Sequence, residues 1–326
     1  MSRAQRWAAE LVCSDLGLGR LEALLFHTWA LSIGSSLPAW CKIWLTTIHN
    51  LRTLWTKSGG DIKAVRNTPI VRQLVAEAVA YLVLSQKHPL PTLPTDKDCF
   101  REAEAMRARI RSGGGAPNQI VTSRIWVQQL DGEDLRTIGN ELELSIKSNQ
   151  IHRTLFWIIW IITLESQTGA PIAKERGPAF LSVKQRKSII WFLVQLLKEL
   201  ANDSHYLPVD ERKALFEILE LTWPKLGAKG RRDCIVAIAL AIQENIAKKN
   251  SLTLGSVNQN PDQTAIRAVF TTIDTIYAGI AEEARKYVLE VPVMAGLTKE
   301  ASQPKQTKTK LTAMDKLNLS YSLISK

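Results

Sequence analysis

Basic side chains next to glycines form the pattern in this chain that most clearly suggests chemistry. The stretch "KLGAKGRRD" (225–233) combines two glycines with four cations, which are Lys225, Lys229, Arg231 and Arg232. Glycines leave backbone N–H groups accessible, and the N-terminus of a helix with cations beside it is a ready site for an anion. We therefore predict that these four cations form the main anion-binding patch. In the alternative interpretation the arginines are solvated, or pair with Asp233 or Glu220.

The overall charge supports an anionic partner. The chain has 42 Lys and Arg against 31 Asp and Glu, a formal net charge of +11, and such an excess favours binding to anions such as nucleic acid. Two further clusters are therefore candidate nucleic-acid-binding sites: Arg107, Arg109 and Arg111 in the first, and Lys184, Arg186 and Lys187 in the second. Lys174 and Arg176 form a smaller cluster nearby.

Motifs of catalysis and cofactor binding are not found. The sequence contains no phosphate loop of the GxxxxGK[ST] type, no GxGxxG after a strand, no HExxH and no GxSxG. The five histidines and four cysteines lack ligand spacing, and the cysteines are expected to be buried thiols of an intracellular protein. Acidic residues in "DGED" (131–134) are predicted to cap a helix rather than to hold a metal. We expect no enzymatic activity, no cofactor and no metal site.

Apolar residues recur with helical spacing throughout, and the alternation typical of strands is hard to find. The predicted fold class is all-α, a bundle of about eleven helices in one or two lobes. The expected helices span residues 3–14, 20–33, 38–57, 68–87, 96–112, 131–147, 150–166, 182–202, 208–223, 230–249 and 261–290.

The most apolar stretch, 155–164, is only ten residues long, whereas a helix that crosses a membrane needs about 20. It is apolar on nearly every side, which is typical of a helix buried inside a bundle. We therefore predict that Trp157, Trp160 and Trp191 are core residues and that the chain does not enter a membrane. Of the ten tryptophans, only Trp126 is expected to be exposed.

Segments rich in glycine and proline suggest the domain boundaries. The segment "SGGGAPN" (112–118) is the best linker candidate. We predict an N-terminal helical lobe over 1–112, a linker over 113–120, a C-terminal bundle over 121–290 and a flexible basic tail over 291–326.

The end of the tail has a different pattern. Apolar residues recur there at steps of three or four, which is one face of a short amphipathic helix: Leu311, Met314, Leu317, Tyr321 and Ile324. A short apolar stripe on a tether is suited to docking into a groove of a partner or of a second copy of the chain. In the alternative, the segment folds back onto its own domain.

Four segments carry a resemblance to known proteins: "VRQLVAEAVAYLVLSQK" (71–87), "LFWIIWIITLES" (155–166), "RGPAFLSVKQRKSIIWFLVQLLKEL" (176–200) and "ALFEILELTW" (214–223). Together they resemble a set of helical proteins encoded by large DNA viruses of protists, which are similar in turn to the helical collar of replication-factor-C-type clamp loaders. The resemblance implies a non-enzymatic accessory protein of DNA replication or genome handling, located in the cytoplasm or a viral factory. It carries over no catalytic residue, because the phosphate loop of the ATPase is missing. The alternative function is a structural protein of a virion or other large assembly, with acidic protein partners.

Overall fold

The structure is a computed structural model. It describes residues 2–13, 17–34, 37–59, 61, 65, 68–95, 116–165, 173–203, 207–250 and 262–290. Predicted features at Arg107, Arg109, Arg111 and in the tail after residue 290 lie outside these residues.

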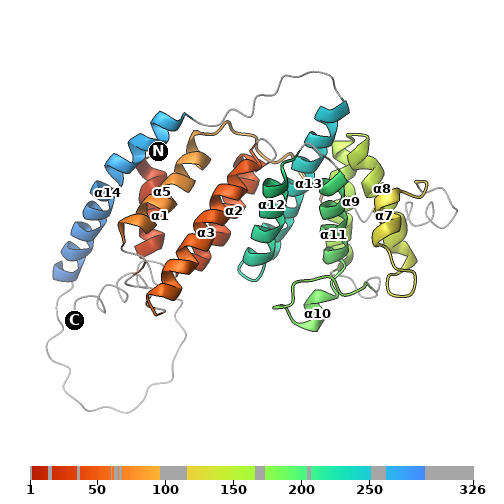
Figure 1. The fold of residues 1–326 in the computed structure, drawn as a ribbon, viewed down its shortest axis with the longest axis horizontal. Coiled ribbons are helices and arrows are strands. Elements are labelled where there is room, and N and C mark those ends of the chain that lie inside the picture. Colours follow the sequence, from red (N-terminus) through yellow and green to blue (C-terminus); the bar gives the residue numbers. More distant parts are fainter. Residues whose placement is uncertain are drawn as a thin grey trace, which may run out of the picture. The chain divides into compact units, whose positions relative to one another are not determined.

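The described part of the chain is all-α, as predicted, with twelve helices and no strand (Figure 1). The helices are α1 (Ser2–Cys13), α2 (Gly17–Ser32), α3 (Ala39–Lys57), α5 (Pro69–Leu84), α7 (Ile120–Ile125), α8 (Glu133–Lys147), α9 (Ile151–Glu165), α10 (Val183–Arg186), α11 (Ile190–Asp203), α12 (Val209–Thr222), α13 (Ala228–Asn250) and α14 (Gln263–Glu290).

Two compact units are present, and each is discontinuous in sequence. Unit 1 takes the described residues within 1–21, 50–84 and 262–290, and unit 2 takes those within 22–49 and 85–250. This division differs from the two successive lobes suggested by the glycine-rich segment. Packing between helices far apart in the chain, which glycine and proline punctuation does not report, creates the difference.

Unit 1 is built around α1, α5 and α14, each of which packs against the other two. The buried residues of α14 recur at steps of three or four and so form one apolar stripe: Ile266, Val269, Ile273, Tyr277 and Ile280. Gln5 of α1 donates a hydrogen bond to the carbonyl oxygen of Ala76 in α5, at 2.8 Å. Arg72 of α5 pairs with Asp274 of α14 at 3.3 Å. These polar contacts add directional links to a small apolar core.

Unit 2 has its core around α13 and α9. Every side chain from residue 233 to residue 243 is buried, so this central part of α13 is enclosed on all sides. In α9, Trp157 and Trp160 are buried and their rings stack with centroids 4.7 Å apart. Trp191, at the start of α11, is buried as well. The sequence-based prediction that these three tryptophans are core residues is therefore confirmed.

Further tryptophans form a second stack within unit 2. Trp29 of α2 lies parallel to Trp40 of α3, with ring centroids 6.4 Å apart, and Trp40 stacks on Trp44 at 5.9 Å. The expectation of a single exposed tryptophan at Trp126 is wrong. Trp126 is half-buried, whereas Trp7 is 60% exposed and Trp55 is also exposed.

Two helices differ from the sequence-based expectation. The helix predicted over 182–202 is interrupted between α10 and α11, because a carboxylate oxygen of Glu165 accepts a hydrogen bond from the backbone N–H of Ile189 at 2.9 Å and starts a new helix there. Helix α7 was not predicted. Its first N–H groups are bound by the buried carboxylate of Glu143, which accepts from Val121 at 3.1 Å and from Thr122 at 2.7 Å. In both cases the capping group is remote in sequence.

Within the described ranges, no helix combines the length and the apolar character that spanning a membrane requires.

Candidate nucleic-acid interface

A loop over residues 173–187, which ends in α10, holds one of the predicted basic clusters; we call it the α10 loop. It is anchored by a buried ion pair, in which the Arg176 guanidinium contacts both carboxylate oxygens of Asp131 at 2.7 and 2.5 Å. The two side chains are 7% and 0% exposed. Arg176 also donates to the carbonyl oxygen of Ile125 at 2.8 Å, and it lies over the Phe192 ring, 5.2 Å from its centroid. Arg176 therefore fastens the loop to unit 2 and is not available to an anion.

Asp131 has a different role from the predicted helix cap. It accepts hydrogen bonds from the backbone N–H groups of Lys174 and Val127, both at 2.8 Å, in addition to those from Arg176. Burial on its own would raise the pKa of this carboxyl group, but the hydrogen bonds from Arg176, Lys174 and Val127 together lower the pKa below its usual value. Asp131 therefore stays ionised and ties the start of the loop in place.

Glycine is required at position 177 by close packing. A Cβ atom there would lie 2.7 Å from Cα of Arg186 and 2.8 Å from Nε1 of Trp191. The backbone N–H of Gly177 donates to the carbonyl oxygen of Arg186 at 3.1 Å. The two ends of the α10 loop are thus in direct contact.

Arg186 organises the tip of the loop. Residues 178–181 form a turn in which the N–H of Leu181 donates to the carbonyl oxygen of Pro178 at 3.0 Å. The Arg186 guanidinium donates to the carbonyl oxygens of Ala179 and Leu181, at 3.2 and 2.8 Å, and it pairs with Glu175. Arg186 was predicted to bind nucleic acid, but these contacts commit its guanidinium to the turn.

The lysines of the same loop are exposed. Helix α10 begins with a capping box, in which the Ser182 side chain accepts from the N–H of Gln185 and the Gln185 side chain accepts from the N–H of Ser182. This cap fixes the segment that carries Lys184 and Lys187. The side chains of Lys174, Lys184 and Lys187 are exposed, and none forms an ion pair with another described residue. Lysines rather than arginines are therefore the free cations of this loop.

The cluster predicted as the main anion-binding patch is largely engaged. Lys225 pairs with Glu22 at 2.7 Å, and Arg232 pairs with Asp233 at 3.1 Å. Arg231 donates to the carbonyl oxygen of Trp223 at 3.0 Å and lies over the Trp223 ring, 4.9 Å from its centroid. Burial lowers the pKa of Arg231.

For Arg232 the alternative interpretation, pairing with Asp233, describes the structure. Only Lys229 in this cluster is exposed and without an ion pair to the rest of the described chain.

The structure brings the two clusters to the same end of unit 2. Nε1 of Trp191 donates to the carbonyl oxygen of Gln185 in α10 at 3.0 Å. The Trp191 ring contacts the Trp223 ring with centroids 4.8 Å apart, and the Arg231 guanidinium lies over the Trp223 ring. In Figure 1, α10 and the turn between α12 and α13 lie at the same end of these helices. We call the four exposed lysines at this end, Lys174, Lys184, Lys187 and Lys229, the lysine group.

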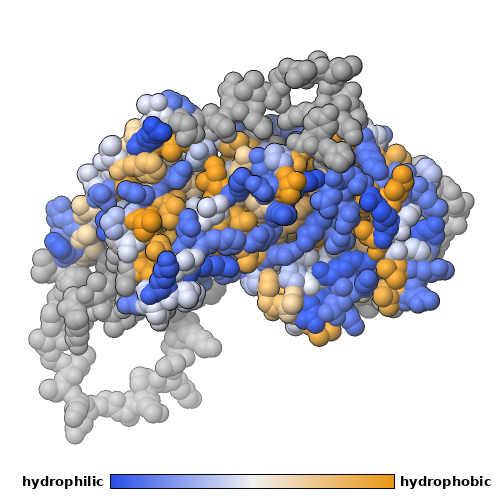
Figure 2. Space-filling model, in the orientation of Figure 1, coloured by the Kyte–Doolittle hydropathy of each residue, from blue (hydrophilic) through white to orange (hydrophobic). Residues whose placement is uncertain are grey.

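Apolar side chains accompany the lysine group. Phe180 is 58% exposed and Val183 is 53% exposed, although both belong to the well-anchored α10 loop. Figure 2 shows apolar surface among hydrophilic residues around the place of α10. Sequence reasoning did not single out Phe180. The only local signal was the proline two residues before it, which is a common start for a turn.

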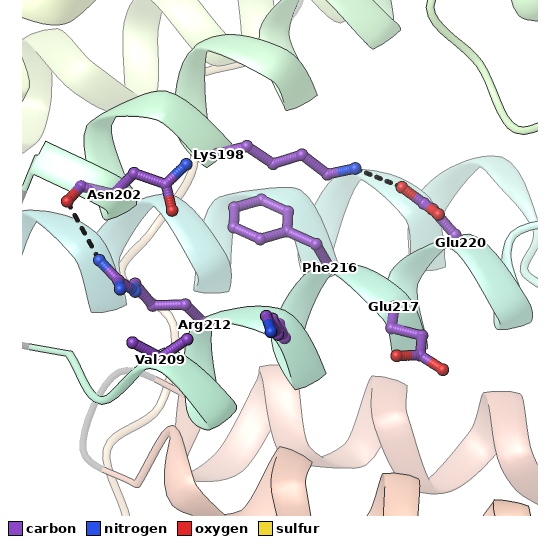
Figure 3. Close-up of a pocket in the computed structure, with 8 residues that line it drawn as sticks. Lys198, Asn202, Val209, Arg212, Phe216, Glu217 and Glu220 are labelled. Carbon is purple, nitrogen blue, oxygen red and sulfur yellow. Dashed lines mark hydrogen bonds and ion pairs between the residues drawn. The ribbon is translucent and has the colours of Figure 1, made fainter.

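Unit 2 also has a groove between α11 and α12 (Figure 3). It has a volume of about 550 Å³. Lys198 pairs with Glu220 across it, and Arg212 donates to the carbonyl oxygens of Ala201 and Asn202 at 2.9 and 3.1 Å. Arg212 thereby satisfies carbonyl groups in the last turn of α11. These side chains join the two helices, so we assign the groove a structural role.

Other titratable groups of unit 2 are paired or buried. His27 Nε2 lies 3.0 Å from Asp233 Oδ2, and burial raises the pKa of the Cys41 and Cys234 thiols. No group of three or more His, Cys, Asp or Glu side chains among the described residues is placed to hold a metal ion. Trp126 is held by a hydrogen bond to the carbonyl oxygen of Gly132 at 3.3 Å and by Arg136 over its ring.

Comparisons of the chain with protein-family models, with curated proteins and with solved structures gave no match.

Proposed function

We propose that the protein is a non-enzymatic, basic helical adaptor that binds nucleic acid through its phosphates. The observation that carries the proposal is the lysine group. At one end of unit 2 the arginines are committed to internal contacts, while Lys174, Lys184, Lys187 and Lys229 project without ion pairs to the described residues. Phosphate binding needs cations that are free to displace counterions, and these lysines meet that requirement.

Support for a non-enzymatic role comes from the acidic side chains of unit 2. Asp131, Glu141, Glu143 and Asp233 are all buried, and each accepts hydrogen bonds that position a loop, a helix start or a basic side chain. Such groups are engaged in stabilising the fold. The resemblance to viral helical proteins and to the clamp-loader collar supports an accessory place in DNA replication or genome handling, inside the cell and within a larger assembly.

The test replaces Lys184, Lys187 and Lys229 together by glutamine. The control replaces Lys57, Lys213 and Lys286, three exposed lysines elsewhere in the chain, and changes the net charge by the same amount. The first variant should bind nucleic acid more weakly. Its plot of log affinity against log salt should be shallower, with the magnitude of the negative slope reduced by about two to three. Fluorescence anisotropy at several salt concentrations measures both quantities. Equal slopes for the two variants would remove the support for this surface.

A second contact is proposed at the C-terminal segment with Leu311, Met314, Leu317, Tyr321 and Ile324, which would dock onto a protein partner or a second copy of the chain. Support for it is the apolar periodicity alone. Deletion of residues 311–326 should leave the melting temperature nearly unchanged and should lower the oligomer mass in light scattering or release a co-purifying partner. Early melting of a monomeric truncation would place the segment in the core.

The alternative function, a structural protein with acidic protein partners, is favoured by one observation. Phe180 and Val183 add exposed apolar area to the lysine group, and a protein partner would cover apolar and basic surface together. An acidic partner would be released by salt, but the lysine variant would then leave the affinity for nucleic acid unchanged.

A further inference from the structure

Phe180 has an exposed side chain on a backbone that is held by hydrogen bonds. It occupies the turn at residues 178–181, and Arg186 donates a hydrogen bond to the carbonyl oxygen on each side of it, at Ala179 and at Leu181. Leu181 is buried and anchors the turn from below. The backbone at the tip of an exposed loop is usually mobile. In this loop, by contrast, the backbone that carries Phe180 is held by hydrogen bonds on both sides.

An exposed aromatic ring on an ordered backbone is suited to binding a flat partner. The backbone has little conformational freedom left to lose when the ring is covered, so more of the contact energy is kept as affinity. Unpaired nucleobases stack on aromatic side chains in proteins that bind single strands, with cations alongside that follow the phosphates. Bases inside a duplex are already stacked and do not offer a free face to a single ring.

We propose that the α10 loop binds single-stranded nucleic acid, with one unpaired base stacked on Phe180 and the neighbouring phosphates on Lys184 and Lys187. The proposal rests on the proposed function, because it takes phosphate binding by the lysine group as given. Lys184 follows Phe180 by four residues, and the capping box of α10 holds it in the same rigid loop. Aromatic stacking tolerates every base, so the site has affinity for single strands without a defined sequence.

The experiment measures the affinity of full-length wild type and Phe180→Ala by fluorescence anisotropy for three probes. The probes are a labelled single-stranded oligodeoxynucleotide, an abasic strand with the same number of phosphates, and a duplex of the same length. Phe180→Ala should bind the base-bearing strand about fivefold to a hundredfold more weakly. It should bind the abasic strand and the duplex within about twofold of the wild type, with an unchanged salt slope, because stacking releases no counterions.

Two further variants sharpen the result. Phe180→Trp keeps an aromatic face and should retain the affinity of the wild type for the base-bearing strand. Val183→Ala removes an equally exposed apolar side chain from the same loop and should leave all three affinities unchanged. An equal loss for Phe180→Ala on the base-bearing and abasic strands, or an equal loss for Val183→Ala, would overturn the stacking proposal. The same variants are also measured against labelled polyglutamate, and a loss of affinity confined to this acidic polypeptide would overturn the stacking proposal and indicate a docking surface for acidic protein.

The outcomes separate this inference from the proposed function. If the Lys184, Lys187 and Lys229 variant loses affinity while Phe180→Ala binds like the wild type, phosphate binding stands and stacking is wrong. If the wild type shows no salt-dependent binding to any of the three probes, both proposals fail.

Discussion

Arg176 and Asp131 form a bidentate ion pair that is almost completely buried and that joins two segments 45 residues apart. The pair connects the start of the α10 loop to the segment between α7 and α8. Because the α10 loop carries Phe180 and three lysines of the lysine group, this ion pair is the structural basis of the candidate interface.

Asp131→Asn should destabilise unit 2. The replacement leaves the buried guanidinium of Arg176 without its counter-charge, and breaking one side of a buried ion pair costs about 3–5 kcal/mol. Urea unfolding followed by circular dichroism measures the change. The double variant Asp131→Asn with Arg176→Gln removes the unpaired charge and should recover part of the loss. A double variant no more stable than the single one would show that the charge is not the cause.

Stability should depend on pH through Asp131. Its pKa is lowered in the folded state, and the usual pKa of an aspartate is about 3.9. The stabilisation of the fold by ionised Asp131 is therefore fully present above about pH 4–5, and it is lost as the pH falls through the pKa of Asp131 in the folded state. The difference in unfolding free energy between wild type and Asp131→Asn should stay constant from neutral pH down to that region and should narrow below it. A difference that remains constant in stronger acid would contradict this assignment.

Gly177→Ala should disturb the α10 loop. The new Cβ would lie 2.7 Å from backbone Cα of Arg186, which cannot turn away as a flexible side chain would. Overpacking of this kind typically costs about 1–3 kcal/mol, and affinity for nucleic acid should fall as the loop shifts. Gly227→Ala is the control, since a Cβ there would meet no atom within 4 Å. Its melting temperature should match that of the wild type.

Trp160→Ala should destabilise the core of unit 2 by about 3–5 kcal/mol, as other large-to-small changes in cores do. Trp160 is 3% exposed and stacks on Trp157. Trp7→Ala, at a tryptophan that is 60% exposed, should change the unfolding free energy by no more than about 0.5 kcal/mol. Similar denaturation midpoints for the two variants would mean that burial does not govern the effect.

Much of the secondary structure follows from the sequence alone. The 3.6-residue repeat of apolar side chains predicts α8, α9, α12 and α14 to within a few residues, because helix formation and the burial of one face are both determined by near neighbours. The same reasoning predicts the burial of Trp157 and Trp160, which lie in a helix with no polar side to expose.

Which basic side chains remain free to bind an anion depends on the tertiary structure. Arg176, Arg186 and Lys184 occur in the same short basic stretch, and nothing local distinguishes them. The partner of Arg176 is 45 residues away, and the partner of Lys225 is 203 residues away. The strength of an ion pair depends on distance and burial, which the folded chain sets and sequence spacing does not.

The breaks and starts of helices have the same explanation. The sequence predicts a single helix over 182–202 because Ser182 is a suitable helix start and no glycine or proline follows it within this range. The carboxylate of Glu165, brought up from the end of α9, binds the N–H of Ile189 and begins α11 there. Apolar periodicity is a local property and was visible in the sequence. The partners of unsatisfied backbone groups and of buried charges come from distant parts of the chain, so only the tertiary structure identifies them.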